Sequence, residues 1–396
     1  MKYSKIQTKY QRRLGLYGLG FLLTLTIGLV YYFEIYTLRI ERFTELRVMD
    51  AYLVSIPEYS VVKPEVTHIP IPEEVRGIYW TAVTAGAPQK HIDYMIKSGL
   101  NTAVIDLKMD DGALAFEPYS KVLKPYVMKR PFIHDLDELL ENLGKQNIYR
   151  IARIAVMRDG VYALEHQEMA VKNLAGNLWQ DNIGSLWLDP SSQDVADYAI
   201  NLGKEAYSRG FDEIQYDYVR FPSDGKLSNI IYPVFDQVKS KSEVMREFFK
   251  KVGVTLQDEE IPVSFDLFGM TFVYNSDFNI GQRLVDVYPY TDYISPMVYP
   301  SHYTSNFRGH VNPALAPYDI IYSTLESGID ILVSELGVSP EESRRKVRPW
   351  LQDFDIGAVY TSDLIEAQIE ATRMASSSGW ILWNARNVYE TANYLP

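Results

Sequence analysis

The sequence predicts a (β/α)₈ barrel preceded by a single N-terminal transmembrane helix, and three observations indicate this class. Short apolar or β-branched runs alternate with helical stretches from about residue 76 to the C-terminus. Several predicted strands end in Asp, which is typical of barrels that keep reactive side chains at the carboxyl ends of their strands. The uncharged run 14–33 has the length that a helix needs to span a bilayer.

The N-terminal part is predicted to anchor the chain in a membrane. Residues 1–13 carry Lys and Arg but no acidic residue, so the positive-inside rule places them in the cytoplasm and the barrel outside the cell. The alternative is a cleaved signal peptide, which the long apolar run and the bulky residues after it disfavour. Residues 34–74, with several prolines in their second half, are expected to form an extracellular stalk, and residues 75–396 the barrel domain.

Composition excludes several classes of function. The net charge of −12 argues against a nucleic-acid partner, which would need a basic face. The absence of Cys excludes disulfides, thiolate metal sites and Cys nucleophiles. The six His residues form no H-x-x-x-H or H-E-x-x-H pair, so we expect no metal and no cofactor.

The strands and helices follow from the periodicity and from the turn residues between them. Helices are predicted over about 88–98, ending at Gly99, around 136–143, and over about 193–208, ending at Gly210. A doubly wound sheet is the alternative fold, but the turn after the first strand, residues 81–87, lacks the G-x-G-x-x-G of dinucleotide-binding sheets. The eight predicted strands are 77–81, 102–107, 149–156, 213–218, 261–266, 293–299, 347–353 and 380–384.

The predicted catalytic centre is a set of Asp residues at strand ends. Asp106 ends the second predicted strand, Asp217 the fourth, Asp266 the fifth and Asp353 the seventh. The carboxyl ends of barrel strands meet at one face, and a buried carboxylate without a partner is costly. We therefore expect these side chains to converge and to carry chemistry, with Arg220 as a partner of Asp217.

Two carboxylates on an open barrel face suggest glycoside hydrolysis, in which one is the acid and the other the nucleophile or the base. Aromatic side chains near the strand ends would serve as platforms for sugar rings, and polar side chains would bind hydroxyl groups. The predicted substrate-binding residues are Tyr79, Trp80, Asp106, Asp110, Gln215, Arg220, Tyr299, His302, Gln352, Trp383 and Asn384.

Five stretches carry a resemblance to a known family: RGIYW at 76–80, QYDYVRFP at 215–222, SPMVYP at 295–300, RPWLQDF at 348–354 and GWILWN at 379–384. Through them residues 76–396 resemble the bacterial putative glycosyl hydrolase domain family, a group of barrel proteins similar to the α-amylase clan. The resemblance implies a barrel that acts on a glycan.

The clan's pattern, carried over position by position, makes Asp217 the nucleophile, Asp266 the acid and Asp353 a stabilising carboxylate. The chain departs from this pattern at Asp266, because the clan uses Glu as the acid and Asp is one methylene shorter. Asp110 and Asp111 are therefore reserve candidates for the acid.

We thus expect a membrane-anchored extracellular glycoside hydrolase that acts on a polysaccharide by a two-carboxylate, retaining mechanism. Carboxyl groups about 5–5.5 Å apart would favour retention, and a separation of about 6.5–9.5 Å would favour inversion. The alternative from another class is a catalytically silent, glycan-binding barrel that tethers the cell envelope to a polysaccharide. An esterase or deacetylase is a third reading. Convergence of the carboxylates in an aromatic-lined pocket would favour the enzyme.

Overall fold

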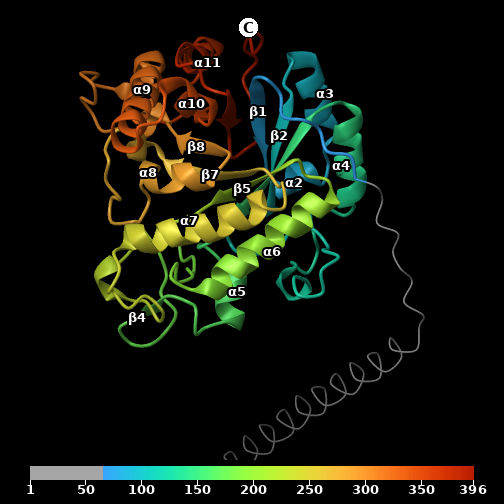
Figure 1. The fold of residues 1–396 in the computed structure, drawn as a ribbon. Helices are drawn as coiled ribbons and strands as arrows, with labels where there is room; N and C mark the ends of the chain where they lie inside the picture. Colours follow the sequence, from blue (N-terminus) through green and yellow to red (C-terminus); the bar gives the residue numbers. More distant parts are fainter. Residues whose placement is uncertain (1–65) are drawn as a thin grey trace, which may run out of the picture. The chain divides into compact units, whose positions relative to one another are not determined.

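The predicted barrel is confirmed in the computed structural model, which describes residues 66–396. Eight parallel strands close in the order β1-β2-β3-β5-β7-β8-β9-β10, with helices around them (Figure 1). Each predicted strand has a counterpart, with bounds that differ by a few residues. The barrel strands are β1 (Val75–Trp80), β2 (Thr102–Lys108), β3 (Tyr149–Ala155), β5 (Glu213–Asp217), β7 (Val263–Phe268), β8 (Tyr293–Met297), β9 (Trp350–Gln352) and β10 (Gly379–Trp383).

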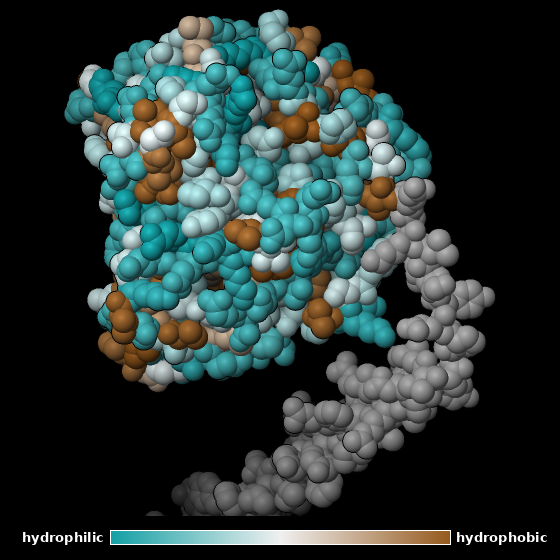
Figure 2. All heavy atoms as spheres, viewed as in Figure 1, coloured by the Kyte–Doolittle hydropathy of each residue, from teal (hydrophilic) through white to brown (hydrophobic). Residues whose placement is uncertain are grey.

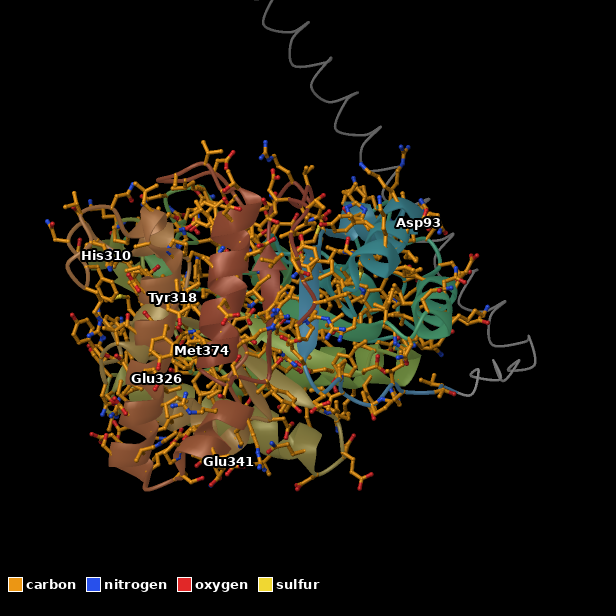
Figure 3. All side chains as sticks on the ribbon, turned by 90° about the horizontal axis from the view of Figure 1, so that it is seen from above. Asp93, His310, Tyr318, Glu326, Glu341 and Met374 are labelled. Atoms are coloured by element: carbon orange, nitrogen blue, oxygen red, sulfur yellow. The ribbon has the colours of Figure 1, made fainter. Side chains whose placement is uncertain are left out.

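The predicted helices also form, and two of them end where glycine permits it. Gly99 and Gly210 have φ of 72° and 116°, the left-handed conformation that closes a helix C-terminus. The α-helices of this part of the chain are α2 (Ala82–Ala85), α3 (Gln89–Ser98), α4 (Leu136–Lys145), α5 (Gly160–Glu165), α6 (Gln193–Arg209), α7 (Lys241–Gln257), α8 (Leu284–Val287), α9 (Pro317–Leu336), α10 (Pro340–Arg345) and α11 (Ser362–Met374). Figure 3 shows α9, marked by Tyr318 and Glu326, beside α11, marked by Met374.

Two short strands that the sequence does not predict lie outside the barrel. β4 (Lys172–Asn173) pairs antiparallel with β6 (Ile230–Ile231), and these strands belong to the loops that follow β3 and β5. A strand of two residues has no detectable period. The surface in Figure 2 is mainly hydrophilic, with apolar side chains in small separate groups, as is usual for protein surfaces.

Alternate residues of each strand point into the barrel, and the interior is polar at both ends. Near the amino ends of the strands, the buried Arg348 donates to Glu213, which also accepts a 2.6 Å hydrogen bond from Ser264. One step toward the carboxyl ends, Gln215 Nε2 donates to Ser295 Oγ at 2.9 Å. Still closer to the carboxyl ends of the strands, further charged side chains come together, and these form the candidate site.

The predicted anchor 14–33 and most of the predicted stalk 34–74 lie outside the described residues. In residues 66–396, no helix is both long enough and apolar enough to cross a bilayer. The last part of the predicted stalk, residues 66–74, packs on the barrel instead of forming a free spacer. Arg150 Nη2 donates to the Thr67 carbonyl at 2.9 Å, and the ring of His68 stacks on Tyr207 at 3.9 Å.

Candidate active site

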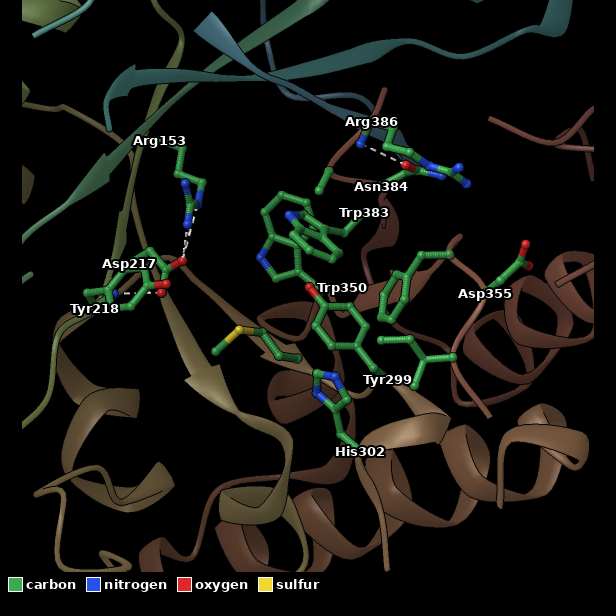
Figure 4. Close-up of a pocket in the computed structure, with 14 residues that line it drawn as sticks. Arg153, Asp217, Tyr218, Tyr299, His302, Trp350, Asp355, Trp383, Asn384 and Arg386 are labelled. Atoms are coloured by element: carbon green, nitrogen blue, oxygen red, sulfur yellow. Dashed lines mark hydrogen bonds and ion pairs between the residues drawn. The ribbon is translucent and has the colours of Figure 1, made fainter. Parts of the chain in front are cut away.

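A cavity of about 520 Å³ opens at the carboxyl ends of the strands (Figure 4). Its wall is aromatic, since Trp383 contacts Tyr299 and Phe354 with ring centroids 5.8 and 5.1 Å apart. The lining residues are Arg153, Asp217, Tyr218, Met297, Tyr299, His302, Trp350, Phe354, Asp355, Ile356, Trp383, Asn384, Ala385 and Arg386.

Arg153, on β3, is the centre of the charged floor of this cavity. One terminal nitrogen of its guanidinium, Nη1, donates to Asp106, and the other, Nη2, donates to Asp217. Its Nε lies 3.2 Å from Asp217 Oδ2 and 3.9 Å from Asp266 Oδ2. Three carboxyl groups from β2, β5 and β7 therefore surround one buried cation, which offsets the unfavourable burial of negative charge.

Both oxygens of Asp217 accept hydrogen bonds from groups that can only donate. Oδ2 is bound by the Arg153 guanidinium, and Oδ1 accepts the backbone N–H of Tyr218 at 2.6 Å. Tyr218 has a φ of 53°, a left-handed conformation that is unusual for an aromatic residue and that costs free energy. These donors fix the orientation of the Asp217 carboxyl group.

Asp266 has the opposite surroundings. It is 1% exposed, its Oδ1 accepts the indole N–H of Trp350 at 2.8 Å, and its Oδ2 has no hydrogen-bond partner among residues 66–396. Burial, and then the charge of Asp217, raise the pKa of Asp266 well above its ordinary value. These surroundings favour the protonated form of Asp266, which is the form that a general acid needs.

The separation of these two carboxyl groups is compatible with both a retaining and an inverting mechanism. Their Oδ2 atoms share Arg153 Nε as a neighbour, so they lie at most about 7 Å apart, a bound that both retaining and inverting pairs can meet.

Two further predicted residues join the site from the side of β1 and β2. Tyr79 donates its hydroxyl to Asp106, and its ring lies 5.7 Å from the Arg153 guanidinium. Asp110 is held by Arg158 at 2.6 Å, and Arg158 also donates to the Tyr218 hydroxyl at 2.8 Å. The cluster around Asp217 therefore continues into the loop after β2.

Several predicted substrate-binding residues line the cavity. They are Tyr299, His302, Trp383 and Asn384, together with the predicted nucleophile Asp217. Burial lowers the pKa of His302, so its imidazole is neutral near pH 7 and can either donate or accept a hydrogen bond. In residues 66–396, no group of His, Asp and Glu has an arrangement that would hold a metal ion.

Other predicted site residues lie elsewhere. Trp80 follows the inward-facing Tyr79, and neighbouring residues of a strand face opposite sides, so Trp80 points out of the barrel. There it packs against His91 on α3. The Arg220 guanidinium is buried between the rings of Trp187 and Phe268, at 4.8 and 4.7 Å.

Two amide side chains that were predicted to bind substrate do not line the cavity but support the residues around it. Gln215 lies one step deeper in the barrel, bonded to Ser295. Gln352 donates to the carbonyl groups of Phe354 and Ile356, and so holds the loop that supplies part of the cavity lining.

Asp353, the predicted stabilising carboxylate, is not brought to the other carboxyl groups. Its side chain is 2% exposed, and it accepts the backbone N–H of Glu390 at 3.3 Å. Burial raises the pKa of Asp353 to about 7. Asp353 follows Gln352, whose side chain turns inward, so its own side chain points away from the barrel interior.

Among the site residues that the sequence prediction missed, Arg153 and Trp350 lie next to the carboxyl group of Asp266, and each had a signal. Arg153 lies in a strand that is buried along its whole length, where a cation needs acidic partners. Trp350 has the same strand parity as Gln352, so it also faces the barrel interior.

Comparison with known proteins agrees with the fold. No curated protein sequence is significantly similar to the chain. The PgaB (BpsB) glycoside hydrolase domain from Bordetella bronchiseptica is similar in structure, with 12% identity and a TM-score of 0.56 over 80% of this chain and 94% of that one. A hypothetical protein from Ruminiclostridium thermocellum is 30% identical over 48% of this chain and 97% of that one, with a TM-score of 0.42. The model of the family described as "Putative glycosyl hydrolase domain" matches residues 77–389, so the chain belongs to this family of glycoside hydrolases.

Proposed function

We propose that this protein hydrolyses glycosidic bonds of a polysaccharide, with Asp217 and Asp266 as its catalytic pair. The observation that carries the proposal is that Arg153 and Asp217 line an aromatic-walled cavity and form an ion pair, and that the same Arg153 lies 3.9 Å from the buried carboxyl group of Asp266. Aromatic walls suit the apolar faces of sugar rings, and paired carboxyl groups are what glycoside hydrolysis requires. The fold shared with a glycoside hydrolase domain is consistent with this chemistry.

The proposed reaction retains the configuration at the anomeric carbon. Asp217 forms a bond to that carbon while the bond to the leaving oxygen breaks and this oxygen takes the proton of Asp266. Water then attacks the glycosyl–enzyme ester, gives its proton back to Asp266 and releases Asp217. Arg153 is the cation beside the pair, a role that the sequence prediction gave to Arg220. It offsets the negative charge that Asp266 carries between the two steps.

The proposal also includes attachment to the cell membrane, with the barrel outside. Its support is the uncharged run 14–33 and the basic residues before it. Protease added to intact cells should then cleave the barrel domain. Survival of the full-length chain in intact cells, with digestion after lysis, would reverse this orientation.

The test of the activity uses the full chain in detergent and a panel of purified cell-envelope polysaccharides. We expect the wild type to release reducing ends from one polysaccharide, and Asp217→Asn and Asp266→Asn to lose at least about 10³-fold in rate. Asp355→Asn is the matched control, because Asp355 lines the same cavity but makes no ion pair with Arg153.

NMR of the first product anomer would report retention or inversion. Binding without turnover in wild type and variants alike would favour the glycan-tethering barrel. Equal rates for wild type and Asp217→Asn would contradict the assignment of the pair.

A further inference from the structure

Trp350 both lines the cavity and contacts the buried acid. It is 2% exposed, and its indole Nε1 lies 2.8 Å from Asp266 Oδ1. An indole N–H can donate a hydrogen bond but cannot accept one. The Oδ1 atom must therefore present a lone pair to Trp350, and it cannot carry a proton along that contact.

The other oxygen of Asp266 is the one available for the proton. Oδ2 is buried and has no hydrogen-bond partner in the described part of the chain. The charged and titratable groups that act on this carboxyl are Asp217 on β5, Arg153 on β3, Arg348 before β9 and Tyr299 after β8. Of these, Arg153 has its Nε 3.9 Å from Oδ2, beyond hydrogen-bond distance.

We propose that Trp350 is the positioning residue of the acid: its N–H fixes the carboxyl plane of Asp266 and keeps the transferable proton on Oδ2, the oxygen on the side of Arg153 and Asp217. This inference rests on the proposed function, in which Asp266 protonates the leaving oxygen. In that step the Oδ2–H bond breaks, the leaving oxygen gains the proton, and Asp266 becomes a carboxylate. The Trp350 N–H then stabilises this anion through Oδ1.

The kinetic test compares Trp350→Phe with Trp383→Phe. Phenylalanine keeps an aromatic ring at position 350 but removes the N–H, whereas Trp383 is a tryptophan of the same cavity wall that packs on Tyr299 and Phe354. We expect Trp350→Phe to lower kcat at least about tenfold with little change in KM, because the acid is misplaced while the sugar platform remains. The basic limb of its pH–rate profile should move up by about 0.5–1 pH unit, because the carboxylate loses a donor.

Trp383→Phe should instead raise KM and leave the limbs of the profile in place. A Trp350→Phe profile that coincides with that of the wild type would overturn the inference.

A second measurement does not depend on any substrate. Infrared spectroscopy of the full chain at neutral pH should show a protonated-carboxyl C=O band that is absent from Asp266→Asn. In Trp350→Phe this band should move to higher wavenumber, since the C=O at Oδ1 no longer accepts a hydrogen bond, and in Trp383→Phe it should stay.

The infrared result separates the inference from the proposed function. If no polysaccharide is hydrolysed but the band moves only in Trp350→Phe, the placement of the proton stands and the glycosidase proposal fails. If the wild type has no such band, or Trp350→Phe leaves it in place, the inference is wrong whatever the activity.

Discussion

Asp353 is a carboxyl group whose charge is unfavourable in the folded chain. It lies against the C-terminal segment, near the carboxylates of Glu390 and Asp355, and burial raises its pKa to about 7. An acid whose pKa is raised on folding stabilises the fold at low pH, where it is protonated in both states. As pH rises from about 4 to about 7, the unfolded chain ionises this group first, so the folded state loses stability.

Asp353→Asn should therefore stabilise the protein at neutral pH. The gain in the free energy of unfolding at pH 8 should be at most about 4 kcal/mol, the value of the whole pKa shift, and it should vanish near pH 4. Asparagine can still accept the Glu390 N–H, so the contact is kept. Thermal unfolding at both pH values measures this, with Asp236→Asn as control, because Asp236 also accepts a backbone N–H but is exposed. A gain of equal size at pH 4 would mean that the charge is not the cause.

At the scale of elements, the contact of α6 with β5 requires a glycine. A Cβ on Gly203 would lie 2.3 Å from the hydroxyl oxygen of Tyr216, and this hydroxyl donates to the Ala199 carbonyl at 2.8 Å. Gly203→Ala should lower the free energy of unfolding by about 1–3 kcal/mol, although alanine is the better helix former.

The Tyr216→Phe background removes the atom that clashes, and there the same alanine should be neutral or stabilising. Denaturant unfolding of the four chains of this double-mutant cycle measures the coupling. Additive effects would show that the helix simply moves away from the strand.

The segment 66–71 is an element without regular structure, yet it is bonded to the barrel. Ile69 N–H donates to Asp212 Oδ1 at 2.7 Å, and His68 and Arg150 bind the same carboxylate. A fragment that begins at residue 72 should be less stable than one that begins at residue 66 by about 1–3 kcal/mol, because it loses two hydrogen bonds and a ring stack. Equal denaturation midpoints would show that these contacts contribute nothing.

The elements that the sequence predicted well are those with strong periodic or capping signals. β2 and β3 are buried on both faces and are rich in apolar and β-branched residues, and α3 and α6 end in left-handed glycines. β9 is shorter than predicted, since the ladder keeps only residues 350–352 of the run 347–353.

At the scale of the whole molecule, the closure of the barrel determines which of the predicted residues reach the site. Asp106, Asp217 and Asp266 meet because each faces inward near the carboxyl end of a barrel strand, and closure of the barrel brings them to one cation. Beyond the ends of the strands, side chains no longer alternate between the two faces. The sequence therefore did not indicate that the Arg220 guanidinium would lie between aromatic rings. Arg153 was missed because its partners lie on other strands.

The barrel carries buried charge at both of its ends, and the two ends should respond differently to substitution. Near the amino ends of the strands, Glu213 and Arg348 are fully buried partners, and Tyr149 adds a 3.3 Å hydrogen bond to Glu213. At the other end, Asp266 is a buried acid whose Oδ2 has no hydrogen-bond partner among the described residues. Removal of one partner at the first end would leave a buried charge uncompensated, whereas the acid at the second end is retained at a cost in stability, as is common for reactive groups.

Glu213→Gln should lower the free energy of unfolding by about 3–5 kcal/mol, because it leaves the Arg348 cation buried without its counter-charge. Asp266→Asn makes the same change of carboxyl to amide but keeps an acceptor for Trp350, so it should leave Tm unchanged or raise it at neutral pH. Hydrolysis should show the reverse order, with Asp266→Asn inactive and Glu213→Gln active wherever it is folded. Thermal unfolding and a reducing-end assay on the same preparations measure both properties. A fall in Tm for Asp266→Asn as large as for Glu213→Gln would mean that the acid also holds the barrel together.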